Sequence, residues 1–150
     1  MRRTPALLIS LFVLSLTIVA QETNTLNTGA PVERTIRPGE VHLFEVHVEE
    51  PSRILVVVEQ HGVDIVIRVT DPKSVSLGEF DSPTGQEGSE SASVIAPTSG
   101  SYKFAVSLLD QEVKPQQTGR YVIKLEEVRA AQRGDFVYAH RDLYCARPGG

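Results

Sequence analysis

The residues of this 150-residue chain that could carry chemistry are few and widely spaced. Its four histidines are His42, His47, His61 and His140, and its one cysteine is Cys145. His42 and His47 have opposite parity on one predicted strand, so they point to opposite faces and do not share a metal ion. His140 and Cys145 have the types of a base and a nucleophile, but they lie in a tail without a supporting core, which favours an ordinary free thiol. With no Gly-x-Ser-x-Gly, His-Glu-x-x-His or phosphate-binding glycine loop, the sequence predicts no catalytic residue.

Acidic residues gather in a loop containing Gly and Pro, predicted over residues 81–90. Asp81, Glu87 and Glu90 offer the hard oxygen ligands that calcium prefers, and Asp71 is expected nearby. Their spacing matches no calcium-loop pattern, and acidic turn residues are commonly solvated. A solvated loop is therefore the favoured interpretation, and calcium at these residues is the alternative. The sequence indicates no other metal or cofactor.

A second short motif is Arg133-Gly134-Asp135, the tripeptide that some cell-adhesion receptors read. Three residues match easily by chance, and Asp135 is also placed to cap the N-terminus of a predicted helix. Adhesion is therefore kept only as a minor alternative.

The elements that must position these residues are short strands separated by Gly and Pro turns. About eight apolar segments recur at a spacing of roughly 10 to 15 residues, without a helical pattern among them. The segments are 31–36, 42–49, 54–58, 63–70, 76–80, 92–96, 101–107 and 120–126. This pattern predicts an all-β fold, an antiparallel β-sandwich of jelly-roll-like type.

Two segments, 99–106 and 118–125, are nearly interchangeable, because each runs from a Gly turn through a Tyr into apolar/polar alternation. We expect these two strands to pair antiparallel and to share one core. The residues expected to be buried are Phe44, Val46, Ile65, Ile67, Tyr102, Phe104, Val106, Tyr121, Ile123 and Leu125.

The two ends of the chain differ from this pattern. Residues 1–20 have two Arg, then an apolar run ending at Ala20, which is typical of a secretory signal peptide rather than a membrane span. Cleavage after Ala20 is expected, with an uncleaved anchor as the alternative, and residues 21–30 form a polar leader. Residues 129–150 are predicted to be a short helical tail, with an apolar face formed by Phe136, Ala139, Leu143 and Tyr144.

Composition excludes several partners. Residues 1–20 carry two Arg and no acid, so removing them leaves 13 basic and 19 acidic residues, a formal charge of −6. Such acidity without a Lys/Arg cluster excludes nucleic acid and anionic membrane as expected partners after signal cleavage. A single cysteine also excludes an intramolecular disulfide. The domain must therefore be held together by its apolar core.

A set of ordered motifs carries a family resemblance. They are 39–44 (GEVHLF), 56–64 (VVVEQHGVD), Asp71-Pro72, 81–85 (DSPTG), 99–102 (SGSY) and 119–121 (GRY). This series, over about residues 26–130, resembles the bacterial pre-peptidase C-terminal (PPC) domain, as found at the N-terminus of secreted proteins with tetratricopeptide repeats and a caspase-like CHAT peptidase. The resemblance implies a PPC-like sandwich over 31–128, and Arg129-Ala130-Ala131 would open the repeat region.

Together these observations predict a secreted or periplasmic accessory module and not an enzyme. We expect it to bind, stabilise or present a partner, either a polypeptide or a glycan, through the loop from Asp81 to Glu90. One alternative is a truncated N-terminal remnant of a multidomain CHAT-type protein, and another is a calcium-binding or adhesive module. No catalytic residue is carried over from the resemblance.

Overall fold

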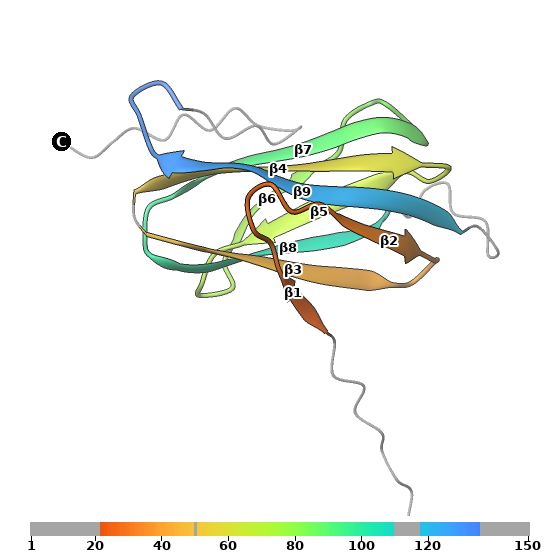
Figure 1. The fold of residues 1–150 in the computed structure, drawn as a ribbon, viewed down its shortest axis with the longest axis horizontal. Coiled ribbons are helices and arrows are strands. Elements are labelled where there is room, and N and C mark those ends of the chain that lie inside the picture. Colours follow the sequence, from red (N-terminus) through yellow and green to blue (C-terminus); the bar gives the residue numbers. More distant parts are fainter. Residues whose placement is uncertain (1–21, 50, 110–117, 136–150) are drawn as a thin grey trace, which may run out of the picture.

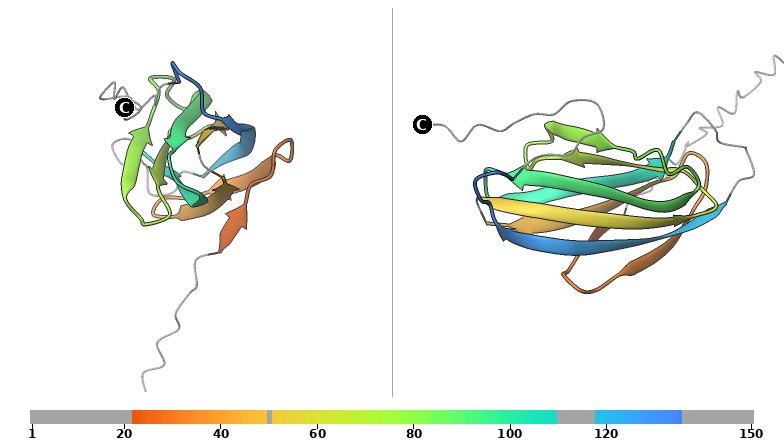
Figure 2. Two further views of the ribbon diagram at one scale, coloured as in Figure 1. Left: turned by 90° about the vertical axis from the view of Figure 1, so that its left-hand side faces the viewer. Right: turned by 90° about the horizontal axis from the view of Figure 1, so that it is seen from above.

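The structure, a computed structural model, describes residues 22–49, 51–109 and 118–135, and the regular elements in these ranges are all β-strands. They form two sheets packed face to face (Figures 1 and 2). The strands are β1 (Thr23–Thr25), β2 (Val32–Ile36), β3 (Val41–Val48), β4 (Ser52–His61), β5 (Ile65–Thr70), β6 (Ser76–Phe80), β7 (Glu87–Ala96), β8 (Gly100–Leu108) and β9 (Gly119–Ala130). Within these ranges no helix is long and apolar enough to span a membrane.

One sheet has five strands in the order β1-β3-β8-β5-β6, and the other has four in the order β2-β9-β4-β7. All neighbouring strands are antiparallel except β1 and β3, which are parallel. Consecutive strands often lie in different sheets, so the chain crosses repeatedly from one layer to the other. The predicted all-β sandwich is confirmed.

Alternation along each strand directs apolar side chains between the sheets. Along β4 the even-numbered residues are buried, whereas the odd-numbered ones are half-buried up to Val57 and exposed at Glu59 and His61. All ten residues predicted to be in the core are at most 3% exposed. The sequence therefore predicted the inward-facing phase of these strands correctly, because a period of two specifies which face of a strand is apolar.

The predicted pairing of the two similar strands is wrong. β8 lies between β3 and β5, whereas β9 lies between β2 and β4, so the two strands belong to opposite sheets. Tyr102 and Tyr121 do contribute to the same core, but from opposite layers. Alternation specifies which face of a strand is buried and says nothing of its hydrogen-bonded neighbour. The same local pattern therefore serves equally well in either sheet.

The predicted polar leader, residues 21–30, also contains a strand and a core residue. Thr23–Thr25 form β1 beside β3, and the Leu26 amide donates to the Glu45 carbonyl over 2.9 Å. Leu26 itself is 3% exposed and joins the core. A single large apolar residue in a polar stretch carries no periodicity, so this contact could not be predicted from the sequence.

The C-terminal boundary of the domain lies later than predicted. β9 continues to Ala130, which pairs with Ser52 of β4, and a register shift at Leu55/Val56 accommodates the extra length. Arg129 and Ala130, predicted to be helical, are therefore in a strand, because pairing with β4 outweighs their local helix propensity. The rest of the predicted tail beyond residue 135, the predicted signal peptide and Gln21 lie outside the described residues.

The strand phase can be tested by a pair of neighbouring substitutions. Phe104 is fully buried and Lys103 is exposed on the opposite face of β8. Phe104→Ala should lower the free energy of unfolding by about 3–5 kcal/mol, since it leaves a cavity in the core. Lys103→Ala should be nearly neutral. Urea denaturation of both variants measures this, and equal losses would contradict the assigned phase.

Candidate functional site

The most distinctive polar region lies where the chain passes from β6 in one sheet to β7 in the other. The connecting loop is residues 81–86, which is shorter than the predicted loop of 81–90, because β7 begins at Glu87. Glu87 and Glu90 are in strand positions, paired with His61 and Val58 of β4. Their polar character suggested a loop, but the ladder with β4 continues through them.

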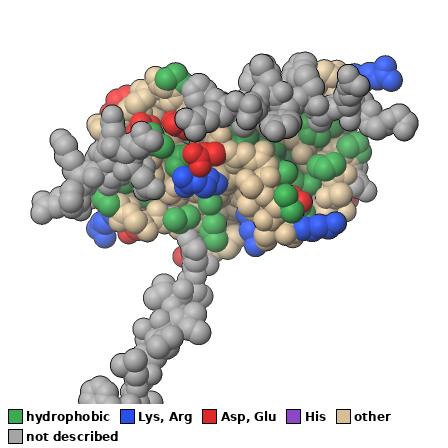
Figure 3. Space-filling model, turned by 180° about the vertical axis from the view of Figure 1, so that it is seen from behind, with side chains coloured by type: hydrophobic (Ala, Val, Ile, Leu, Met, Phe, Trp, Pro, Cys, Tyr) green, Lys and Arg blue, Asp and Glu red, His purple; other side chains and the backbone are tan. Residues whose placement is uncertain are grey.

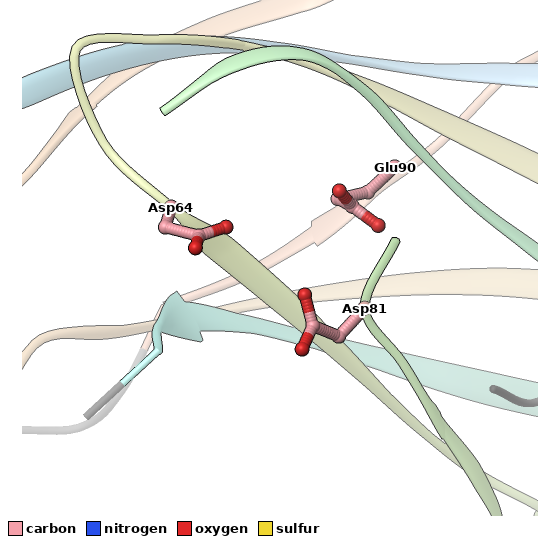
Figure 4. A group of neighbouring side chains, drawn as sticks. All are labelled: Asp64, Asp81 and Glu90. Carbon is pink, nitrogen blue, oxygen red and sulfur yellow. The ribbon is translucent and has the colours of Figure 1, made fainter. Parts of the chain in front are cut away.

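Three carboxylates meet beside this loop, and we call them the carboxylate cluster: Asp64, Asp81 and Glu90. One oxygen of each lies within 4.8 Å of the others. Asp64 directly precedes β5, Asp81 directly follows β6, and Glu90 lies in β7 (Figure 4). The cluster therefore joins residues of both sheets. Asp64 was not among the acids considered from the sequence, since its distance from Asp81 along the chain hides their proximity.

Two of the acids considered from the sequence do not belong to this cluster. Glu87 accepts a hydrogen bond from the Gly62 amide over 3.0 Å and lies 3.5 Å from the His61 ring nitrogen Nδ1. Asp71 accepts hydrogen bonds from the backbone amides of Lys73 and Val75, so it shapes its own turn. Of the three predicted calcium ligands, the structure thus brings together Asp81 and Glu90 but not Glu87.

Glu90 is the buried member of the cluster, with no exposed surface. It accepts hydrogen bonds from the Ser82 amide at 2.5 Å, the Thr84 hydroxyl at 3.0 Å and the Gln60 side-chain amide at 3.4 Å. Burial raises the pKa of the Glu90 carboxyl above its usual 4.5, and the charge of Asp81 adds to this, while the hydrogen bonds from Ser82 and Thr84 oppose it. The predicted solvated-loop environment is therefore wrong for Glu90.

Gln60 holds the loop from below, and it too has no exposed surface. Its amide nitrogen donates to the Gly85 carbonyl over 2.5 Å and to the Thr84 hydroxyl over 3.2 Å. Its amide oxygen accepts from the Ile65 amide over 2.9 Å. One side chain from β4 thus fixes both the start of β5 and the 81–86 loop. The loop is a rigid extension of the sandwich because buried polar partners satisfy its backbone.

The three described histidines occupy ordinary strand positions. His42 Nδ1 lies 2.7 Å from the Tyr121 hydroxyl, a contact between the two sheets, and burial raises the pKa of Tyr121. His47 lies 3.4 Å from Ser101, its direct cross-strand partner. The His42 contact follows from the packing of the two sheets, and the His47 contact follows from the register of β3 with β8. Neither is the pairing of a nucleophile with an activating base. His140 and Cys145 lie outside the described residues.

The Asp of the adhesion-like tripeptide is occupied by contacts within the chain. Two Asp135 oxygens accept hydrogen bonds from the Arg129 guanidinium at 2.6 and 2.8 Å, and one also accepts from the Gln132 amide at 2.7 Å. The Arg129 hydrogen bonds hold the pKa of Asp135 well below its usual range. The side chain is only 12% exposed. This geometry argues against presentation of Asp135 to an adhesion receptor.

Comparisons with known proteins define the fold of this domain. The pre-peptidase C-terminal domain of a collagenase from Bacillus anthracis is similar, with a TM-score of 0.57 and 14% identity over 75% of this chain and 100% of that one. PliG of Salmonella Typhimurium, a periplasmic inhibitor of g-type lysozyme, has a TM-score of 0.53 and 12% identity over 72% of this chain and 99% of that one. No protein-family model and no curated protein matches the sequence. The chain thus has a PPC-like β-sandwich fold.

The buried carboxyl of Glu90 should give the domain a distinctive pH dependence. Its folded pKa is raised, so the folded state keeps a proton that the unfolded chain has released. The resulting stabilisation is fully present below the unfolded pKa of 4.5 and is lost as the pH rises through the folded value. The free energy of unfolding of the native protein minus that of Glu90→Gln should therefore fall with rising pH.

Urea denaturation at a series of pH values from about 4 to about 8 measures this difference. Glu59→Gln is the matched control, because Glu59 is exposed on β4, the strand paired with β7. A difference for Glu90→Gln that stays constant or rises with pH would contradict the burial of this carboxyl.

Proposed function

We propose that this domain is a non-catalytic accessory module of an exported protein and that it binds a polypeptide through the sandwich end formed by residues 81–89. The observation that carries the proposal is the rigid loop 81–86, held by the buried Gln60 and Glu90 while Pro83, Thr84 and Gln86 are exposed. A loop that is ordered before binding loses little conformational entropy when a partner docks. Export rests on the predicted signal peptide over residues 1–20, and the continuation into repeats and a CHAT peptidase rests on the resemblance.

The charge of this end indicates the kind of polypeptide. Asp81 and Glu87 flank the exposed residues Pro83, Thr84 and Gln86, and Asp64 lies beside them. A partner with a basic surface would be steered toward this end and would meet complementary charge. The PliG neighbour, which inhibits g-type lysozyme, supports the idea that a sandwich of this shape suits a protein partner.

The non-catalytic part of the proposal rests on the chemistry of the site. The cluster consists of carboxylates, and Glu90 is surrounded by hydrogen-bond donors from Ser82, Thr84 and Gln60. A nucleophile needs a neighbouring base to activate it, and the described histidines contact Tyr121, Ser101 and Glu87, none of which belongs to the carboxylate cluster.

Binding can be tested by calorimetric titration of the purified protein with g-type lysozyme and with synthetic peptides of matched length and opposite net charge. We expect basic peptides to bind and acidic ones not to, with weaker binding at higher salt. The double variant Gln86→Ala, Glu87→Gln should weaken binding several-fold, because it alters exposed groups at the loop. Glu126→Gln, which also removes one exposed acidic charge but lies on β9 beside the residues that pair with Leu55 and Val56, should not.

Other outcomes would overturn this proposal. Equal weakening by Glu126→Gln would place the binding surface elsewhere, and binding of soluble oligosaccharides in place of peptides would favour the glycan alternative. Turnover of general peptidase, esterase or glycosidase substrates by the unmodified protein would contradict the non-catalytic assignment.

A second candidate function is calcium binding at the carboxylate cluster, and it is favoured by the meeting of Asp64, Asp81 and Glu90. Carboxylate oxygens are the ligands that Ca²⁺ prefers, and residues from both sheets contribute them. A bound cation would offset the mutual repulsion of three neighbouring carboxylates and the burial of one of them. Here it would stabilise the end of the sandwich that carries the loop.

Added CaCl₂ should raise the melting temperature at neutral pH, since a ligand that binds only the folded state stabilises it by about 2.7 kcal/mol at a concentration 100-fold above Kd. Asp81→Asn and Glu90→Gln should abolish the rise. Glu87→Gln is the matched control and should retain it, because Glu87 contacts His61 and Gly62 instead. An unchanged melting temperature in the native protein would exclude this candidate.

A further inference from the structure

The outer face of the four-stranded sheet carries an apolar strip. The strip consists of Leu55 and Val57 on β4, Ile95 on β7 and Val122 on β9, all of them half-buried. Leu55 and Val57 lie two residues apart, and the register places Ile95 and Val122 diagonally beside them. An antiparallel sheet with one solvated face is expected to alternate apolar inside and polar outside. β4 has apolar residues on both faces, so another segment that covered its outer face would remove this apolar surface from water.

An ion-pair network lies at one end of this strip. Arg53 of β4 and Arg129 of β9 are direct cross-strand partners, two cations side by side. Glu127 accepts a 2.6 Å hydrogen bond from Arg53 and lies 2.5 Å from Arg129, and Asp135 forms two hydrogen bonds with Arg129. Asp135 is also 4.0 Å from the Arg53 Nε. The like charges of the two arginines are thus balanced by two acids, one of which comes from beyond the end of β9.

This network determines where the chain goes after the last strand. The Ala131 amide donates to the Pro51 carbonyl over 3.0 Å, and the Asp135 amide donates to the Gln132 carbonyl over 3.2 Å, which makes a turn. Asp135 is therefore held over the outer face of the same sheet that β9 has just left. Asp135, the last described residue, therefore lies beside the Arg53 end of the apolar strip.

We propose that residues 136–146, which follow Asp135 and lie outside the described residues, cover this strip. Their sequence supplies Phe136, Ala139, Leu143 and Tyr144, which fall on one face at helical spacing. From Arg53 to Glu59 the strip runs along about 20 Å of β4, at 3.3 Å a residue. Eleven residues reach about 16 Å even as a helix, so the segment is long enough to cover most of it.

The native chain offers a direct probe, because Cys145 is its only cysteine. A nitroxide label on Cys145 should broaden the methyl NMR signals of Leu55, Val57, Ile95 and Val122, so that they lose most of their intensity. Leu43, half-buried on the outward side of β3, and Val75, in the β5–β6 turn, are controls that should keep theirs. Loss of intensity on both sides of the molecule, or none on the strip, would overturn the proposal.

A mixing experiment separates this occupant from a second copy of the chain. Isotope-labelled protein without nitroxide is mixed with nitroxide-labelled protein without isotope, so that only contacts between molecules cause broadening. We expect no broadening of the strip signals in the mixture. Broadening there would assign the strip to a self-association surface and would overturn the proposal.

The anchoring network is tested by Arg129→Gln in the nitroxide-labelled protein. Loss of the hydrogen bonds to Asp135 should restore much of the lost intensity at Val57 and Val122. Arg120→Gln is the control, because Arg120 pairs with Glu33 on the same outer face and does not contact Asp135. If Arg129→Gln fails to fold, the double variant Phe136→Ser, Leu143→Ser changes only the covering segment and should restore the intensity. Unchanged broadening in this variant would overturn the proposal.

Discussion

The structure depends on the contact between two apolar sheet faces, since a chain with one cysteine has no internal disulfide to replace that contact. Phe44, Phe104, Tyr102 and Tyr121 are among the largest fully buried side chains. Two polar residues, Gln60 and Glu90, are fully buried beside this core. Their cost is offset only because each is hydrogen-bonded. The same hydrogen bonds hold the loop between β6 and β7, so the conformation of the site depends on the packing of the two sheets.

The features predicted correctly from the sequence depend on local residue patterns. The features that were missed depend on which distant segments pair or pack together. Phe104 and Ile123 were correctly placed in the core, because alternation alone specifies a buried face. The assignment of β8 and β9 to opposite sheets was missed, because pairing is a long-range choice. Leu26 was missed because one apolar residue has no period. Arg129 was predicted to be helical from its local sequence, whereas its strand conformation depends on pairing with β4.

The candidate site shows the same division. Asp81 and Glu90 stood out as acids beside Gly and Pro, and the structure does bring them together. Asp64 escaped notice because it comes from a different turn and meets them only through the crossing between sheets. Glu87 looked equivalent to Glu90, yet one faces the exposed His61 and the other the interior, a difference of parity along β7. Had the register with β4 been known, parity alone would have separated the two.

If the predicted signal peptide over residues 1–20 is removed, the pairing of β1 with β3 has a consequence for the order of events. Cleavage after Ala20 would leave only Gln21 and Glu22 before the first residue of β1. A processing peptidase needs a stretch of accessible backbone on both sides of the scissile bond, and a segment already paired in a sheet edge does not offer it. Processing and the docking of β1 would then compete for the same few residues. A sandwich that completes its other eight strands first would keep its amino-terminal edge open until residues 1–20 are removed.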